Sequence, residues 1–310
     1  MKEVLYITDR GCNVAYLTEV LSILNQKGTI SVTHFDLYQY SRMPDTIQND
    51  YDVLIYQTFP HENHPTKWNA AQIAETDKLF ESFKGPKILF DAHDSSSVNA
   101  FSRFGNQYPR IKAHPTKQYC EEFDVILTTA FTFRKDKYRN KIIPQDTNRT
   151  YDVSYCVSYG YDPIYAQGIS KTFAETKLRE QIRDILKTTN HNVDMGWHDD
   201  YQSYIKSVLI SVCAPGWCEG SLRHLETLNV GALMLAHDCI DDCQLVPNVH
   251  LVEGEDYVSF NLDNLSEKLD YLMNNREEVD RIRFNGQRKF IESYDFNLSA
   301  ETLAKYIETL

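Results

Sequence analysis

Short apolar runs alternate with longer amphipathic segments along the first half of the chain. The strand-like runs occupy 3–8, 30–36, 51–58, 86–92 and 124–129. Helical periodicity occupies 14–26 and 67–83. Nearly continuous apolar strands joined by amphipathic helices are typical of a parallel sheet that is covered on both faces. The first half is therefore predicted to form a Rossmann-like α/β domain.

The same alternation begins again after a polar stretch at 134–150. Strands are predicted at 151–158, 192–195, 207–214, 231–236 and 248–253. Helices are predicted at 170–187, 199–206, 221–229, 264–273, 276–293 and 299–310. The last helix has an apolar face, and we expect it to pack back across a hinge. Two Rossmann-like domains, 1–148 and 149–310, are thus predicted, with parallel sheets that face a central cleft where ligands bind.

Composition narrows the classes of function. The 310 residues are 42% hydrophobic and carry a net charge of −12, which disfavours a nucleic-acid partner. The sequence contains neither a signal-peptide core nor an apolar run of the ~18 residues that a membrane span needs, so a cytoplasmic protein is expected. Seven cysteines without a CxxC pair indicate reduced thiols. His237, Cys239 and Cys243 could hold zinc, but a fourth ligand at recognisable spacing is missing, and no metal site is predicted.

The segment from Cys213 to Ala236 carries the strongest chemical signal. A predicted strand ends in turns that contain Gly216 and Gly220, and the following helix is expected to begin near Ser221, a good N-cap residue. Backbone N–H groups at such a helix start attract anions, and a diphosphate is the natural candidate. Arg223 in the first turn can add a charge-assisted contact to the same phosphates.

Glu226 follows Arg223 by three residues and shares nearly the same helix face. Its carboxylate can accept hydrogen bonds from two ribose hydroxyls. The alternative is an ordinary amphipathic helix, in which Leu222, Leu225 and Leu228 form core and Arg223 and Glu226 form a solvated pair.

The run GSLRHLETLNVGALML (220–235) resembles the S-x-R-x-x-E-A-L-x-x-G signature of exostosin-like and spore-maturation-type glycosyltransferases, which are related to the group-1 enzymes of GT-B fold. The resemblance extends more weakly over 248–290, which is similar to the families' segment in which a strand precedes two helices and a closing R-x-x-x-G-Q/R element. It implies that Glu226 binds the ribose of a nucleotide sugar and that 220–223 hold its diphosphate. Group-1 enzymes usually carry two glutamates with seven residues between them, whereas only six residues lie between Glu219 and Glu226, so the role of the first glutamate does not transfer to Glu219.

Further candidate residues occupy loops that are expected at the cleft. Asp9 and Gly11 follow the first strand, and His93 and Asp94 follow the strand at 86–92. We predict His93, Asp94 and Asp9 as catalytic candidates, because an acceptor hydroxyl needs a general base. Alternatively, Asp94 merely caps the next helix. The predicted donor-binding set is Gly11, Tyr159, Gly160, His198, Gly216, Glu219, Gly220, Ser221, Leu222, Arg223 and Glu226.

The sequence thus predicts a glycosyltransferase that moves a sugar from a UDP- or GDP-sugar to a glycan or another hydroxyl acceptor, with no required cofactor. Three alternatives stay open: a GT-B epimerase or phosphorylase, a phage-type DNA glucosyltransferase, and a non-catalytic protein that binds nucleotide sugars.

Overall fold

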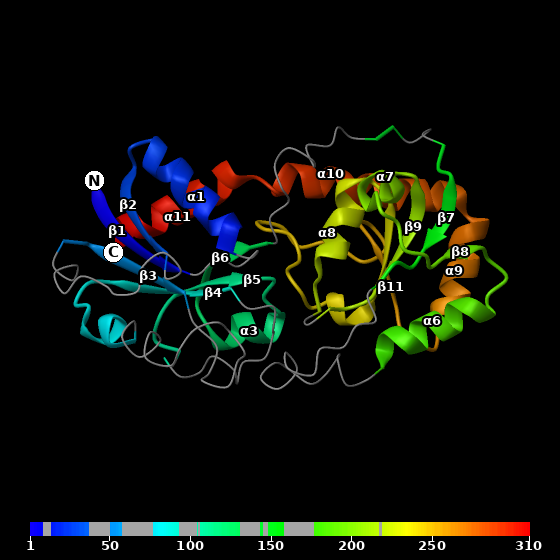
Figure 1. The fold of residues 1–310 in the computed structure, drawn as a ribbon, viewed down its shortest axis with the longest axis horizontal. Helices are drawn as coiled ribbons and strands as arrows, with labels where there is room; N and C mark the ends of the chain where they lie inside the picture. The colour runs from blue at the N-terminus through cyan, green and yellow to red at the C-terminus, as the bar shows by residue number, and fades with distance from the viewer. Residues whose placement is uncertain are drawn as a thin grey trace. The chain divides into compact units, whose positions relative to one another are not determined.

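The computed structural model describes residues 1–8, 14–36, 50–57, 77–92, 104, 106–130, 143–144, 148–157, 177–216 and 219–310. The chain forms two compact units (Figure 1). Unit 1 comprises Met1–Thr132, Pro163–Ile169 and Asp295–Leu310, and unit 2 comprises Phe133–Asp162 and Ser170–Tyr294. The C-terminal segment therefore belongs with the N-terminal unit, which a single boundary near 148 does not capture.

Unit 1 contains a parallel sheet with the strand order β2-β1-β3-β4-β5-β6. Its strands are β1 (Lys2–Thr8), β2 (Ile30–Asp36), β3 (Val53–Gln57), β4 (Lys87–Asp91), β5 (Arg110–Ala113) and β6 (Val125–Thr129). Its helices are α1 (Val14–Gln26), α3 (Lys117–Glu122) and α11 (Phe296–Thr309). Residues 77–82 are also helical, within the predicted helix 67–83. Strands β1, β3 and β4 are almost wholly buried, as their apolar runs predicted.

The C-terminal helix α11 packs on α1 (Figure 1). The Tyr16 hydroxyl and Ser299 Oγ share a buried hydrogen bond of 2.9 Å. The rings of Tyr16 and Phe296 lie 4.8 Å apart. Leu303 and Ile307 are buried on the same helix. The chain thus returns from unit 2 to unit 1, as the apolar spacing of its last helix predicted.

Unit 2 contains a second parallel sheet with the order β11-β10-β9-β7-β8. Its strands are β7 (Tyr151–Ser154), β8 (Val193–Asp194), β9 (Val208–Cys213), β10 (Leu233–His237) and β11 (Val258–Phe260). Its helices are α6 (Leu178–Thr188), α7 (Tyr201–Lys206), α8 (Leu222–Asn229), α9 (Leu265–Asn274) and α10 (Arg276–Ser293), with a 3-10 turn, η4 (Asp238–Ile240). No helix in the described ranges combines the length and apolar character that a bilayer crossing requires.

The sequence predicted one strand wrongly and missed another. The segment 248–253 is not a strand: it forms only isolated bridges, it lies between the left-handed residues Asn248 and Gly254, and β11 begins later, at Val258. Strand β5 was missed because two of its four residues, Arg110 and Lys112, are charged. Both are nevertheless fully buried, so the polarity of the sequence did not report their burial.

Candidate functional site

The order of the strands in unit 2 creates a topological switch point in its sheet. β7 is flanked by β8 on one side and by β9 on the other, so the chain changes direction across the sheet between β7 and β9. In open α/β sheets, ligands bind outside the carboxyl ends of the strands at such a switch point. Residues 214–216 follow β9 there, and residues 219–221 lead into α8. The predicted donor loop therefore lies at the switch point of unit 2.

Helix α8 begins after Ser221, the predicted N-cap. Its capping box is unusual, because His224 takes the position usually held by Glu or Gln. Nδ1 of His224 accepts a hydrogen bond from the Ser221 backbone N–H at 3.0 Å and contacts Ser221 Oγ at 2.8 Å. Burial and then the nearby Arg223 and Arg179 lower the pKa of His224 to about 3. The cap is therefore neutral, and it leaves the positive end of the helix dipole available to an anion.

Arg223 lies in the first turn of α8, with its guanidinium 3.8 Å over the ring of Tyr201. Its Nε is 3.6 Å from Oε2 of Glu226. Within the described part of the chain, neither Nε nor Nη1 of this arginine has a hydrogen-bond acceptor, although both atoms are buried. Burial lowers the pKa of Arg223, and Glu226 opposes that shift. Arg223 thus presents unsatisfied N–H groups beside a helix start, an arrangement suited to a phosphate.

A second arginine, Arg179, supports the same loop. It lies in the first turn of α6, and its Nε and Nη2 donate to the carbonyl oxygen of Pro215 at 3.0 and 2.9 Å. A Cβ added to Gly216 would lie 3.7 Å from Nη2 of Arg179 and 3.3 Å from Cβ of Ser221. Sequence reasoning missed Arg179. The available signal was a cation in the first turn of a helix, where the dipole disfavours it.

The amphipathic-helix alternative for α8 is wrong about which residues face solvent. Leu225 and Leu228 are core, as it required, but Leu222 is 40% exposed. The side chain of Glu226 is only 9% exposed and that of Arg223 is 24% exposed, so the two do not form a solvated surface pair. Gly231, with φ of +66°, ends the helix as predicted. Arg223 and Glu226 are thus largely buried, whereas Leu222 is exposed. This arrangement is typical of a binding site and not of a helix face that is exposed to solvent.

His198, another predicted donor residue, connects to Arg223 through two tyrosines. Its ring stacks on Tyr204 with a centroid distance of 3.5 Å and an angle of 10°. The Tyr204 and Tyr201 rings lie 6.0 Å apart, and Tyr201 lies beneath Arg223. Ring contacts and an ion pair therefore connect His198 to Arg223 and Glu226.

Glu219 faces the neighbouring strand end. Burial raises the pKa of Cys239, which follows β10, and the charge of Glu219 raises it further. Cys239 belongs to η4, directly after β10. Glu219 and Glu226 thus have different neighbours, Cys239 for Glu219 and Arg223 for Glu226.

Six candidates lie outside the described residues: Asp9, Gly11, His93, Asp94, Tyr159 and Gly160. The described strand before His93 ends in Asp91, whose carboxylate accepts a hydrogen bond of 2.7 Å from the Tyr119 hydroxyl. The ammonium of Lys112 lies 3.4 Å from the same carboxylate. Asp91 and Lys112 are fully buried, so this pair anchors the end of β4 inside unit 1.

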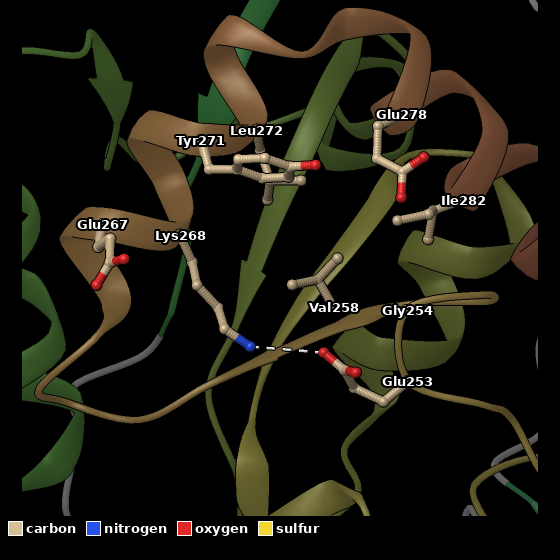
Figure 2. Close-up of a pocket in the computed structure, with 9 residues that line it drawn as sticks. All are labelled: Glu253, Gly254, Val258, Glu267, Lys268, Tyr271, Leu272, Glu278 and Ile282. Carbon is tan, nitrogen blue, oxygen red and sulfur yellow. Dashed lines mark hydrogen bonds and ion pairs between the residues drawn. The ribbon is translucent and has the colours of Figure 1, made fainter.

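Figure 2 shows a pocket of about 320 Å³ at the β11 edge of unit 2. It is lined by Glu253, Gly254, Val258, Glu267, Lys268, Tyr271, Leu272, Glu278 and Ile282. Lys268 reaches across it to Glu253 at 3.5 Å, the dashed line in Figure 2. Three carboxylates against one ammonium disfavour a diphosphate, and none of the predicted donor residues lines this pocket.

No protein-family model and no curated protein matches this sequence. Solved structures do match its fold over the whole chain. Anabaena HepE in complex with UDP and glucose is 12% identical, with a TM-score of 0.54 and 100% of both chains covered. A glycosyltransferase from Rickettsia africae is 11% identical, with a TM-score of 0.53, and the match covers 98% of this chain and 97% of that one. Sucrose-phosphate synthase from Thermosynechococcus elongatus is 11% identical, with a TM-score of 0.53 and coverage of 100% and 99%. The chain has the GT-B fold, as predicted.

Proposed function

From the GT-B fold, we propose that this chain is a glycosyltransferase that takes a sugar from a nucleotide sugar, a UDP- or GDP-sugar, and transfers it to a hydroxyl group of a glycan or another acceptor. Unit 2 binds the donor in this proposal, and unit 1 serves the acceptor. Anabaena HepE has been solved with UDP-glucose and with UDP and glucose, which supports this class of donor.

The observation that carries the proposal is the state of Arg223. A guanidinium with two buried nitrogen donors that find no acceptor among the described residues stands beside the positive start of α8, at the switch point of a parallel sheet. Leaving such donors unpaired costs free energy, and phosphate oxygens would satisfy them. The diphosphate of the donor would therefore lie against Gly220–Arg223, with the ribose near Glu226.

The same groups account for the chemical step. As the acceptor oxygen bonds to C1 of the sugar, the bond from C1 to the diphosphate breaks and negative charge collects on the departing phosphate. Arg223 and the α8 dipole stabilise that charge, and such electrostatic stabilisation is usually the largest single contribution of the protein to catalysis. A general base takes the acceptor proton, and His93, Asp94 and Asp9 remain our proposed candidates. The step as written requires no cofactor.

The first test is the Arg223→Ala variant, assayed by calorimetric titration with UDP and GDP. Loss of a charged hydrogen bond costs roughly 1.5–3 kcal/mol, so nucleotide affinity should fall about 10- to 150-fold. Arg288→Ala removes an exposed arginine from α10 and should leave the affinity unchanged. Equal affinities for wild type and Arg223→Ala would remove Arg223 from the donor site. Nucleotide release that increases only when an acceptor is added would separate transfer from binding alone.

The second test concerns Glu226 and the ribose. Wild type should bind UDP more tightly than 2′-deoxy-UDP, and Glu226→Gln should lose most of that preference, a change of about tenfold or more in the affinity ratio. The ratio isolates the ribose contact, because any disturbance of Arg223 affects both nucleotides alike. Glu267→Gln, on the exposed side of α9, serves as the control. A wild type that never discriminates would make Glu226 a purely structural residue.

A further inference from the structure

Cys156, Asp194 and His198 lie together at the carboxyl edge of the sheet in unit 2. Cys156 follows β7 by two residues, Asp194 ends the neighbouring strand β8, and His198 lies in the loop after β8. Ser154 and Asp194 are in register across β7 and β8, so the residues that follow the two strands lie at the same end of the sheet. One ligand atom from each residue, the Cys Sγ, a carboxylate oxygen and an imidazole nitrogen, lies within 4.8 Å of the other two.

Two of these groups are already oriented by their neighbours. Asp194 uses Oδ1 to accept a hydrogen bond from the Gly196 N–H at 2.8 Å, which turns Oδ2 toward Nε2 of His198 at 3.1 Å. The His198 ring is fixed against Tyr204 by stacking. Neighbours that orient ligand side chains in this way are typical of metal sites.

The distances fit a tetrahedral zinc ion. With Zn–N and Zn–O bonds of about 2.0–2.1 Å, the nitrogen and the oxygen of a tetrahedral site lie roughly 3.3 Å apart. The observed separation of Nε2 and Oδ2 is 3.1 Å. A thiolate at a Zn–S bond of about 2.3 Å would lie roughly 3.5–3.6 Å from each of them. Because Sγ of Cys156 lies within 4.8 Å of both atoms, its side chain needs to close by at most about 1.3 Å.

We propose that Cys156, Asp194 and His198 form a zinc-binding site with an open fourth position. The ion takes the place of the hydrogen-bond proton between Nε2 of His198 and Oδ2 of Asp194, and that proton and the thiol proton of Cys156 are both released to solvent. A thiolate, an imidazole and a carboxylate suit zinc better than magnesium or calcium, which prefer oxygen ligands. Three protein ligands with a vacant position are characteristic of sites that take a further small ligand rather than of closed structural sites.

The site differs from the zinc alternative that the sequence offered. Among the described residues, His237, Cys239 and Cys243 do not form such a group. Nδ1 of His237 instead accepts a hydrogen bond from the Cys239 N–H at 3.3 Å. The proposed site also revises the expectation that the protein has no metal site. It goes beyond the proposed function and does not depend on it.

The cluster is connected to the candidate donor site through two tyrosines. Tyr204 contacts both His198 by stacking and Cys156 Sγ through its hydroxyl at 3.7 Å, and Tyr201 links Tyr204 to Arg223. After burial and Glu226, the interaction with Cys156 is the next influence on the pKa of Arg223. An ion bound to Cys156 would therefore act on the same region of the molecule.

The test uses the full, reduced chain and Co²⁺ as a spectroscopic substitute for Zn²⁺. Wild type should show a thiolate-to-cobalt charge-transfer band in the near ultraviolet, and one equivalent of Zn²⁺ should abolish it. Cys156→Ser should lack the band, and both Cys156→Ser and His198→Asn should lower zinc affinity at least about tenfold. Melting temperatures without metal verify that the variants fold.

Two matched controls are present in the same chain. Cys120→Ser removes an exposed free thiol, and His191→Asn disrupts another histidine–aspartate pair, His191 with Asp270. Both should keep the band and the zinc affinity of wild type. A band that survives in Cys156→Ser, or a folded wild type that shows no band and no zinc uptake, would overturn the proposal. X-ray absorption of the zinc complex should show one sulfur at about 2.3 Å, and a shell of only nitrogen and oxygen would refute it.

Discussion

Arg149→Met is expected to lower the free energy of unfolding of unit 2 by about 3–5 kcal/mol, because a buried guanidinium that satisfies several backbone groups is lost. Nη1 of Arg149 donates to the carbonyls of Lys206 and Val208 at 2.6 and 2.9 Å. Nη2 donates to the carbonyls of Val230 and Gly231 at 3.1 and 2.8 Å. Arg149 thereby ties the start of β9 to the turn between α8 and β10.

The environment of Arg149 shows that this connection is buried. Burial, followed by the charges of Arg283 and Arg276, lowers its pKa to about 10, so it stays protonated at neutral pH. Methionine keeps much of the side-chain volume and removes the donors, which leaves buried carbonyls without partners.

Denaturant unfolding and hydrogen exchange would measure the effect of Arg149→Met. The amides of β9 and β10 should lose protection first, because their strand ends are released. Arg288→Met removes an exposed arginine and should change stability by less than about 0.5 kcal/mol. An equally small change in Arg149→Met would mean that water replaces the four hydrogen bonds without cost.

Gly286→Ala is expected to destabilise unit 2 by about 3 kcal/mol, although helix propensity alone predicts a gain of about 1 kcal/mol. Gly286 lies inside α10, where a Cβ would come within 2.2 Å of the carbonyl oxygen of Asp256 and 3.2 Å of Cδ2 of Leu228. The backbone of Asp256 cannot easily move away from the added Cβ, because the Asp256 side chain is held by two neighbours. Its Oδ2 accepts a hydrogen bond from the Val252 N–H at 2.8 Å and pairs with Lys289 at 2.6 Å.

The thermal midpoint of Gly286→Ala, compared with that of Arg288→Ala, separates packing from propensity. Both changes place alanine in the same helix, but position 288 is exposed. The midpoint should fall clearly in Gly286→Ala and stay nearly constant in Arg288→Ala. A rise in Gly286→Ala would show that α10 can move away from residue 256 at little cost.

Gly286 belongs to a short element, Arg283–Gln287 (RFNGQ), within the segment 248–290 on which the weaker part of the family resemblance rested. Arg283 donates from Nη1 to the Gly231 carbonyl at 3.1 Å, and Gln287 donates from Nε2 to the Asn229 carbonyl at 2.9 Å. The element therefore packs α10 against the turn that follows α8. These contacts hold α8, the helix of the candidate donor site, in place.

The sequence by itself predicted the features that depend on neighbours along the chain. Apolar runs located most strands of both sheets, and Ser221 and Gly231 marked the two ends of α8. Period and capping are local properties, so they can be seen without the tertiary structure. The same rule failed at β5, where Arg110 and Lys112 are buried through contacts with Tyr119 and Asp91 from other elements.

Only the tertiary structure decided which groups meet at the candidate site. The strand order placed the switch point between β7 and β9, and it brought Arg179 to the loop that precedes α8. It also turned Leu222 outward while Glu226 was buried, and it assembled Cys156, Asp194 and His198 from separate segments. Helical spacing fixes which residues share a face, but the neighbouring elements decide which face is covered. Contacts between segments far apart along the chain are set by the order in which the strands pair, and the hydrophobic pattern carries no record of that order.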